Sequence, residues 1–159
     1  MPDIIAPNPA DLPALLALNN AHAIETGELT AARLAALMAT SFRTRIIGPA
    51  DAFLIAFDQT AAYASPNFLW FKERYPRFVY IDRVIVAPPA RGRGLARALY
   101  GDLIAAARAA GHTLLACEVN AQPPNPASDA FHAALGFSEA GRADHVGQGK
   151  TVRFLTLKL

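Results

Sequence analysis

Residues 83–100, RVIVAPPARGRGLARALY, join an apolar run to a helical pattern through a loop rich in proline, glycine and arginine. Pro88 and Pro89 end the apolar run as a strand, because proline cannot donate to a sheet ladder. The first turn of a helix leaves backbone N–H groups without partners and carries partial positive charge. Gly92 and Gly94 let the loop bring such amides close to a bulky anion. The segment therefore predicts a strand, a pyrophosphate-binding loop and a helix in direct succession.

Further strand and helix patterns flank this unit on both sides. We expect strands over residues 3–7, 43–48, 52–58, 78–87, 113–120, 136–142 and 151–159, and helices over residues 8–25, 30–41, 67–75, 95–110 and 127–135. A strand, a helix and a strand in that order make a right-handed parallel unit. The sequence therefore predicts an α/β fold, an α+β arrangement on a mixed sheet, in one domain over residues 1–159.

Composition narrows the function classes. The chain is 53% hydrophobic and 18% charged, with a formal net charge of only +2, so neither nucleic acid nor an anionic membrane is an expected partner. We expect no secretory signal, because the N-terminus has no basic segment followed by an apolar stretch, and no apolar run approaches the ~20 residues that a bilayer requires. Cys117 is the single cysteine, which fits a reducing compartment. We expect a cytoplasmic protein.

A glycine-rich loop before a helix also occurs in dinucleotide-binding proteins. Their fingerprint needs a third glycine, and Arg97 stands at that position in GRGLAR. Glu118, at the end of the next strand, imitates the acidic residue that binds ribose in those proteins. Dinucleotide binding therefore remains an alternative with one clear mismatch.

Two motifs resemble the GNAT acyltransferase superfamily. The pattern V-x-P-x-x-[RQ]-x-x-G-x-[GA] is filled at every specified position by Val86, Pro88, Arg91, Gly94 and Ala96. Residues 125–137, NPASDAFHAALGF, are similar to a later segment of the family, with matching residues at Asn125, Ser128, Phe131, Gly136 and Phe137. The order of elements also resembles that fold, which is a central, splayed, mostly antiparallel sheet flanked by helices.

The resemblance implies that acetyl-CoA binds between two diverging strands as a cosubstrate. It implies backbone contacts to pantetheine from the strand before the loop, pyrophosphate contacts from the loop, and further contacts from the late helix. The residues implied are Val84, Ile85, Val86, Arg91, Gly92, Arg93, Gly94, Leu95, Ala96, Arg97, Asn125, Ser128 and Phe131. The implied reaction transfers an acetyl group from the thioester to the amine of an acceptor that the sequence does not identify.

Three side chains are candidates for proton transfer. The family's usual acid is a tyrosine in the late helix, and His132 stands at the matching position. Histidine also donates protons near neutral pH, so the role survives the exchange. Glu118 and Asp82 are the acidic residues on the two cleft strands and are the candidates for the base. Each of the three also has a purely structural alternative, as a packing residue or an ion-pair partner.

Residues 59–76 are an elaboration that this family usually replaces by a short turn. Residues 63–80 hold half of the aromatic residues of the chain. Three uses stay open: a wall of the acceptor pocket, with Glu73 or Asp58 attracting a cationic amine; a helix that seals the sheet; or a contact between two copies in a homodimer. The four histidines are scattered without ligand spacing, so no metal is expected.

A competing hypothesis assigns the chain to another functional class. A module that binds acyl-CoA as a sensor or scaffold, without turnover, needs the same loop but no acid and no base. The departure at His132 keeps this alternative open.

Overall fold

The computed structural model describes residues 2–145 and 149–159. The elements follow in the order β1 (Ile4–Ile5), α1 (Leu12–Ala21), α2 (Ala23–Thr26), α3 (Ala31–Thr40), β2 (Arg43–Ile47), β3 (Ala52–Asp58), α4 (Pro66–Lys72), β4 (Val79–Val86), α5 (Leu95–Ala109), β5 (Leu114–Gln122), α6 (Pro126–Leu135), β6 (Ser138–His145) and β7 (Lys150–Lys158). No helix in the described part of the chain is both long and apolar enough to cross a bilayer.

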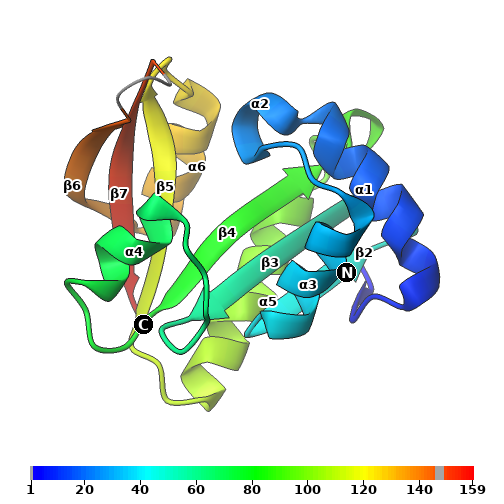
Figure 1. Ribbon diagram of the computed structural model, residues 1–159, viewed down its shortest axis with the longest axis horizontal. Coiled ribbons are helices and arrows are strands. Elements are labelled where there is room, and N and C mark those ends of the chain that lie inside the picture. The colour runs from blue at the N-terminus through cyan, green and yellow to red at the C-terminus, as the bar shows by residue number, and fades with distance from the viewer. Residues whose placement is uncertain (1, 146–148) are drawn as a thin grey trace.

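All seven strands form one sheet in the order β1-β2-β3-β4-β5-β7-β6. Every neighbouring pair is antiparallel except β4 and β5. Those two parallel strands pair only at Val79 with Leu115 and at Tyr80 with Ala116, and then diverge into a V (Figure 1). The expected mixed, splayed and mostly antiparallel sheet is therefore confirmed.

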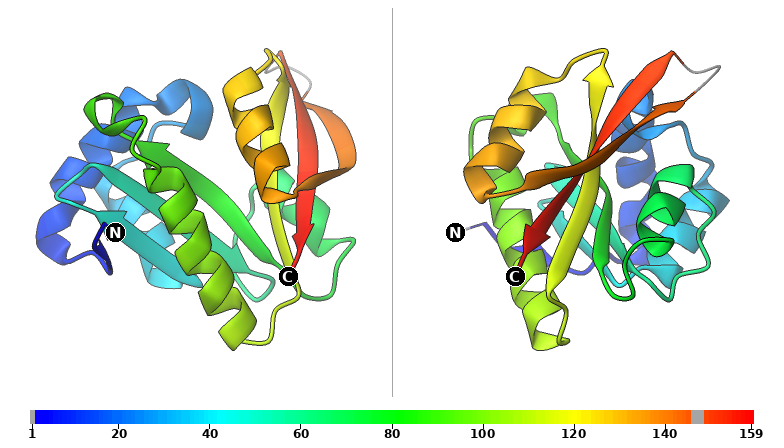
Figure 2. Two further views of the ribbon diagram at one scale, coloured as in Figure 1. Left: turned by 180° about the vertical axis from the view of Figure 1, so that it is seen from behind. Right: turned by 90° about the vertical axis from the view of Figure 1, so that its left-hand side faces the viewer.

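Helices cover both faces of this sheet. Helices α1 to α4 lie on the face turned to the viewer in Figure 1, and α5 and α6 lie on the opposite face (Figure 2). Each side has its own apolar core: Leu15, Leu34 and Phe53 belong to the first, and Leu99 and Leu103 to the second. Because β4 and β5 separate, neither core fills the wide end of the V.

The α5 helix begins where the loop ends, as the sequence predicts. Gly94 is its N-cap with φ +72°, in the left-handed region that glycine adopts at low cost. Gly111, just beyond the other end, has φ +82° and ends the helix. The turn between Ile47 and Ala52 joins β2 to β3, and the two strands pair along the whole of β2.

The inserted segment before β4 forms helix α4 and is built largely into the core. The Phe68 and Phe71 side chains are fully buried, and the Trp70 ring stacks on the Phe154 ring with 4.1 Å between centroids. A Cβ added to Gly141 lies 2.5 Å from the Trp70 ring, so only glycine fits there without a shift. The helix therefore seals the sheet at the narrow end of the V, as one of the three alternatives proposed.

Candidate functional site

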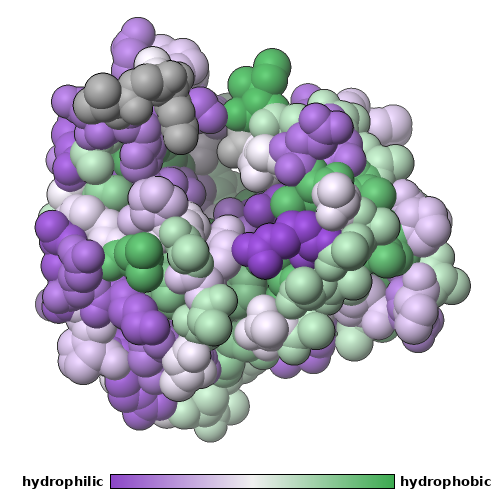
Figure 3. Space-filling view, viewed as in Figure 1, coloured by the Kyte–Doolittle hydropathy of each residue, from purple (hydrophilic) through white to green (hydrophobic). Residues whose placement is uncertain are grey.

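Three adjoining cavities follow the V between β4 and β5. They measure about 360, 400 and 340 Å³ and run from the glycine loop to the middle of β5. Val86 and Arg91 line both the first and the second cavity, and Val84 and Asn125 line both the second and the third. A hollow is visible at the centre of the surface in Figure 3. The cavities together form one continuous cleft.

The loop end of the cleft consists of backbone with little side chain in the way. Gly92 and Gly94 both have positive φ, at +79° and +72°. A Cβ added to either glycine meets no atom within 4 Å, so open space lies over the loop. Leu95 and Ala96, the first residues of α5, also line this cavity. Free N–H groups of a first helical turn beside open space suit a pyrophosphate.

The structure separates the three arginines of the loop. Arg91 and Arg97 line the loop cavity. Arg93 does not line it, and its guanidinium lies 3.5 Å from the Asp51 carboxylate. Arg91 Nη2 lies 3.2 Å from Nε2 of His22, on the other wall of the cleft. The side chain of Arg93 is therefore directed to Asp51, and only its amide belongs to the loop.

The other expected binding residues divide between the three cavities. Val84, Ile85 and Val86 all line the middle one, beside Asn125. The Asn125 side chain caps α6 by accepting from the Ser128 N–H at 3.2 Å, so it has a structural use as well. Phe131 lines the loop cavity, and Ser128 lines the cavity at β5.

Glu118 lies in the third cavity, where β5 has already left β4. The Tyr80 hydroxyl donates to its Oε2 at 2.6 Å, and Asn67 Nδ2 donates to its Oε1 at 3.1 Å. Burial raises the pKa of Glu118 to about 7, against the two hydrogen bonds, and the nearby Asp82 raises it further. A carboxylate with such a pKa changes protonation near neutral pH and suits general-base work.

Asp82 lies in the same cavity but has other partners. Its Oδ2 accepts from Arg83 Nε at 2.7 Å, and its Oδ1 accepts from the Tyr63 hydroxyl at 2.6 Å. Arg83 Nη1 continues the network to Asn19 Oδ1 at 2.7 Å. Both side chains of the ion pair are 5% exposed. This buried, fully bonded pair fits the structural alternative for Asp82 better than the role of base.

His132 lies in the same cavity, 5% exposed, with both ring nitrogens engaged. Nδ1 lies 2.8 Å from the Ser128 carbonyl oxygen and Nε2 lies 2.8 Å from the Tyr100 hydroxyl. A carbonyl oxygen only accepts, so Nδ1 carries the proton and Nε2 of the neutral ring accepts from Tyr100. Burial lowers the pKa of His132 and raises that of Tyr100. Any proton that leaves Nε2 therefore meets the Tyr100 hydroxyl first.

Several residues of this site have no motif in the sequence that would assign them a role. Tyr80, Asn67 and Tyr63 bind the cleft carboxylates through side chains that come from the insertion or from β4. The sequence shows only an aromatic-rich stretch there, which is also the pattern of a core. The polar Asn19 among the leucines of α1 is the one visible signal, and it is fully buried.

Two acceptor candidates lie elsewhere. Glu73 and Asp58 do not line any of the three cavities. Asp58 accepts from the Thr60 backbone and hydroxyl, and the Glu73 carboxylate lies 3.5 Å from Arg74. The prediction that they face an amine pocket is wrong for the cleft. Among the described residues, no group of three or more His, Cys, Asp or Glu side chains is arranged to hold a metal ion.

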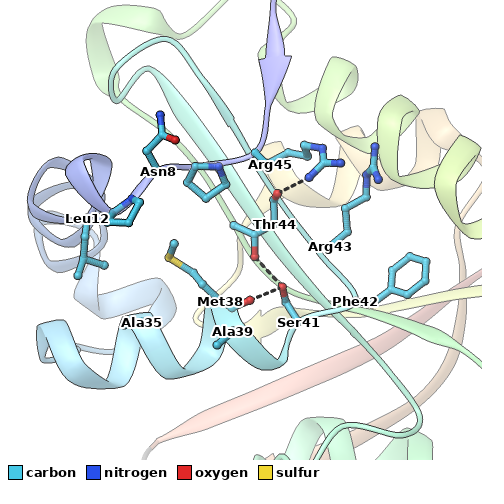
Figure 4. Close-up of a pocket in the computed structure, with 13 residues that line it drawn as sticks. Asn8, Leu12, Ala35, Met38, Ala39, Ser41, Phe42, Arg43, Thr44 and Arg45 are labelled. Carbon is cyan, nitrogen blue, oxygen red and sulfur yellow. Dashed lines mark hydrogen bonds between the residues drawn. The ribbon is translucent and has the colours of Figure 1, made fainter.

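A separate cavity of about 490 Å³ lies between α3, the start of the chain and β2 (Figure 4). Met38, Ser41 and Thr44 line it, and hydrogen bonds of 2.8 Å join the Ser41 hydroxyl to the Met38 carbonyl and to the Thr44 hydroxyl. None of Asp82, Glu118 and His132 lines this cavity. The titratable cluster therefore marks the V-shaped cleft as the functional site.

Comparison with known proteins agrees with this geometry. The sequence model of the family described as "Acetyltransferase (GNAT) family" matches residues 18–137. That range includes the loop, both diverging strands and the whole of α6. No curated protein matches the chain.

Solved structures share the fold over nearly the whole chain. An N-acetyltransferase from Staphylococcus aureus Mu50 is 23% identical with a TM-score of 0.75, covering 99% of this chain and 98% of its own. A ribosomal-protein-alanine N-acetyltransferase from Brucella melitensis is 24% identical with a TM-score of 0.73, covering 99% of both chains. The protein yncA from Salmonella typhimurium, solved with its cofactor acetyl-CoA, is 21% identical with a TM-score of 0.72, covering 100% and 94%.

Proposed function

The chain belongs to the GNAT family of acetyltransferases and is an acetyl-CoA-dependent N-acetyltransferase; we propose that it acetylates a primary amine in the cleft between β4 and β5, with Glu118 as the general base. The observation that carries the assignment of the base is the position of the Glu118 carboxylate. It lies in the same cavity as His132 and beside the strand that is expected to hold the thioester.

In this proposal, the glycine loop binds the pyrophosphate of acetyl-CoA. Open space lies over Gly92 and Gly94, and Arg91 and Arg97 line the same cavity. The backbone of Val84, Ile85 and Val86 binds pantetheine, and one N–H of that strand stabilises negative charge on the thioester oxygen. Asn125, Ser128 and Phe131 line the opposite wall.

The acceptor arrives as an ammonium ion and gives one proton to Glu118. The free amine forms the new C–N bond, and the C–S bond breaks. The Tyr100 hydroxyl protonates the departing thiolate, and the surplus proton of the new amide nitrogen goes to Nε2 of the neutral His132 ring. Nε2 then returns this proton to the Tyr100 oxygen, so both side chains end in their starting protonation states. The Asp82 carboxylate neutralises the Arg83 guanidinium, and this buried ion pair forms part of the cavity wall.

Acceptor-dependent release of thiol tests the proposed function. Purified protein with acetyl-CoA is offered small amines, amino acids and peptides with free N-termini, and free CoA is measured. We expect release that depends on one class of amine. Tight CoA binding without acceptor-dependent release from any amine instead favours the sensor module. Thermal stabilisation by NAD but not by CoA instead favours dinucleotide binding.

The proposal also covers the cellular compartment and the domain organisation. The buried and unpaired Cys117 supports the cytoplasm as the compartment. The connected sheet supports one domain over residues 1–159, whereas a homodimer stays a prediction.

A further inference from the structure

Asn67 links the candidate base to a histidine on another strand. Its Nδ2 donates to Glu118 Oε1 at 3.1 Å, and its Oδ1 lies 2.8 Å from His145 Nε2. An ionised carboxylate only accepts, so the amide NH₂ faces Glu118 and the amide oxygen faces His145. His145 therefore donates from Nε2. The two contacts fix the amide in one orientation.

These residues lie far apart in the sequence. Asn67 is the second residue of α4, Glu118 lies in the middle of β5, and His145 is the last residue of β6. Figure 1 shows α4 in front of β5 and β7 at the narrow end of the V. The inserted helix thus brings a polar side chain to the cleft carboxylate from the face of the sheet that α4 covers.

Helix α4 is held firmly enough to define the position of Asn67. Phe68 and Phe71, on the same helix, are fully buried, and the exposed fraction of each side chain is 0%. Trp70 stacks on Phe154 of β7, the strand next to β5. An aromatic anchor of this kind keeps the neighbouring amide within hydrogen-bond distance of the carboxylate.

The Asn67 and Tyr80 contacts leave part of Glu118 free. Each carboxylate oxygen accepts two hydrogen bonds, and each here has one described donor, Asn67 Nδ2 on Oε1 and the Tyr80 hydroxyl on Oε2. The remaining lone pairs are those available to a proton from the acceptor. Two donors from different elements also prevent rotation of the carboxylate plane.

We propose that Asn67 is a positioning residue for Glu118, oriented in turn by His145, so that the insertion before β4 is part of the catalytic apparatus. This inference rests on the proposed role of Glu118 as base. It gives the inserted helix a second use beyond sealing the sheet.

The Asn67 hydrogen bond favours the ionised form of Glu118 and so lowers its pKa. The other titratable or charged groups that face Glu118 are Tyr80, Asp82 and Arg83 from β4, Tyr100 from α5, Cys117 from β5 and His132 from α6. None of them changes when Asn67 is replaced. Loss of the amide therefore moves the pKa of Glu118 upward.

The first experiment is the pH profile of kcat/KM for Asn67→Ala, with Leu69→Ala as the matched control on the exposed side of the same helix. We expect the acidic limb of the Asn67→Ala profile to move up by about one pH unit, which is a loss of about tenfold in kcat/KM below the limb. The profile of Leu69→Ala stays at the wild-type position. CoA affinity, measured by calorimetry, is expected to stay within twofold for both variants.

The second experiment tests His145. His145→Ala is expected to move the limb in the same direction by a smaller amount, because the Asn67 amide is then free to rotate. His145→Gln offers an NH₂ donor to the Asn67 oxygen and is expected to restore at least half of the shift. A merely structural contact predicts equal losses for both variants without any movement of the limb.

A double-mutant cycle separates this inference from the proposed function. If Asn67 acts through Glu118, the Glu118→Gln/Asn67→Ala variant loses no more activity than Glu118→Gln alone. A large loss in Glu118→Gln with an unmoved limb in Asn67→Ala overturns the positioning role and leaves the base in place. Full activity in Glu118→Gln overturns the base assignment itself, and the positioning role with it.

Discussion

The Tyr100 hydroxyl donates to Nε2 of His132 at 2.8 Å, and the opposite ring nitrogen is held by the Ser128 carbonyl at the same distance. The histidine that stands at the family's acid position is therefore not free: a tyrosine from a different helix occupies its Nε2 within the cleft. Both rings are buried, and a proton on its way from His132 to the departing thiolate has to pass the Tyr100 oxygen.

Tyr100→Phe removes the hydroxyl and keeps the ring. We expect kcat to fall about tenfold or more, since general-acid assistance contributes at least that much, while the Kd for CoA stays within twofold. Stopped-flow or steady-state thiol release measures the first and calorimetry the second. Tyr75→Phe, in the inserted segment, is the matched control. An unchanged kcat in Tyr100→Phe removes the hydroxyl from the proton path.

Gly94→Ala places a methyl group in the open space over the loop. The backbone there has φ +72°, so the variant loses about 1 kcal/mol of stability through left-handed strain. Gly111→Ala, at the other end of α5 with φ +82°, has a similar strain and serves as control. Only Gly94→Ala is expected to weaken CoA binding, by about tenfold, as measured by calorimetry. Equal affinity in the two variants contradicts the pyrophosphate assignment.

Glu118→Gln keeps the shape of the base and removes its charge. We expect kcat/KM to fall about 100-fold or more, and the fall to come mainly from kcat. Because a base works in its ionised form, wild-type kcat/KM rises with pH and levels off above a limb near the Glu118 pKa of about 7. The limb is absent in the variant. Glu73→Gln, on the exposed surface, keeps the wild-type profile.

The same pKa predicts a change of stability with pH. Burial raises the pKa of Glu118 to about 7, above its ordinary value, so the folded state binds the extra proton between these two values. The free energy of unfolding therefore decreases as pH rises through this window, and is level above it. Relative to Glu118→Gln, wild type is expected to lose about 2 kcal/mol between pH 5 and pH 8 in urea unfolding. A constant difference between the two proteins contradicts a buried, titrating Glu118.

Asp82→Asn breaks the buried ion pair and leaves the Arg83 charge uncompensated. We expect a loss of about 3 kcal/mol in the free energy of unfolding. Glu139→Gln breaks the contact of an exposed carboxylate with Arg153 and is expected to cost less than about 1 kcal/mol. In the folded Asp82→Asn protein, kcat should fall less than in Glu118→Gln. The opposite order of kcat values identifies Asp82 as the base.

Local sequence was sufficient for the loop and for the ends of α3 and α5, whereas the single helix expected over residues 8–25 is divided into α1 and α2. Thr30 caps α3 by accepting from the Arg33 N–H, and Gly94 and Gly111 bound α5, because caps and left-handed glycines act over a few residues. The loop cavity contains the expected Gly94, Leu95 and Ala96. These features depend on residues that are neighbours in the chain.

Tertiary structure decided which polar groups meet. The sequence presents Glu118, Asp82 and His132 as three similar candidates, and the fold gives them different partners: Asn67 and Tyr80 for the first, Arg83 and Tyr63 for the second, Tyr100 for the third. It also directs Arg93 away from the loop cavity toward Asp51. The local sequence pattern cannot rank these three candidates, because the ionisation of each side chain depends on groups that lie across the cleft.

The sequence by itself determined the strand–loop–helix unit, because caps and turns are local, and its two motifs indicated the family and, through the resemblance, the splayed sheet. Only the tertiary structure decided which acid is poised to titrate near neutral pH and which is locked in an ion pair. The physical reason is that pKa and hydrogen bonding are set by burial and by side chains that the chain brings together from up to 78 positions away, as between Asn67 and His145.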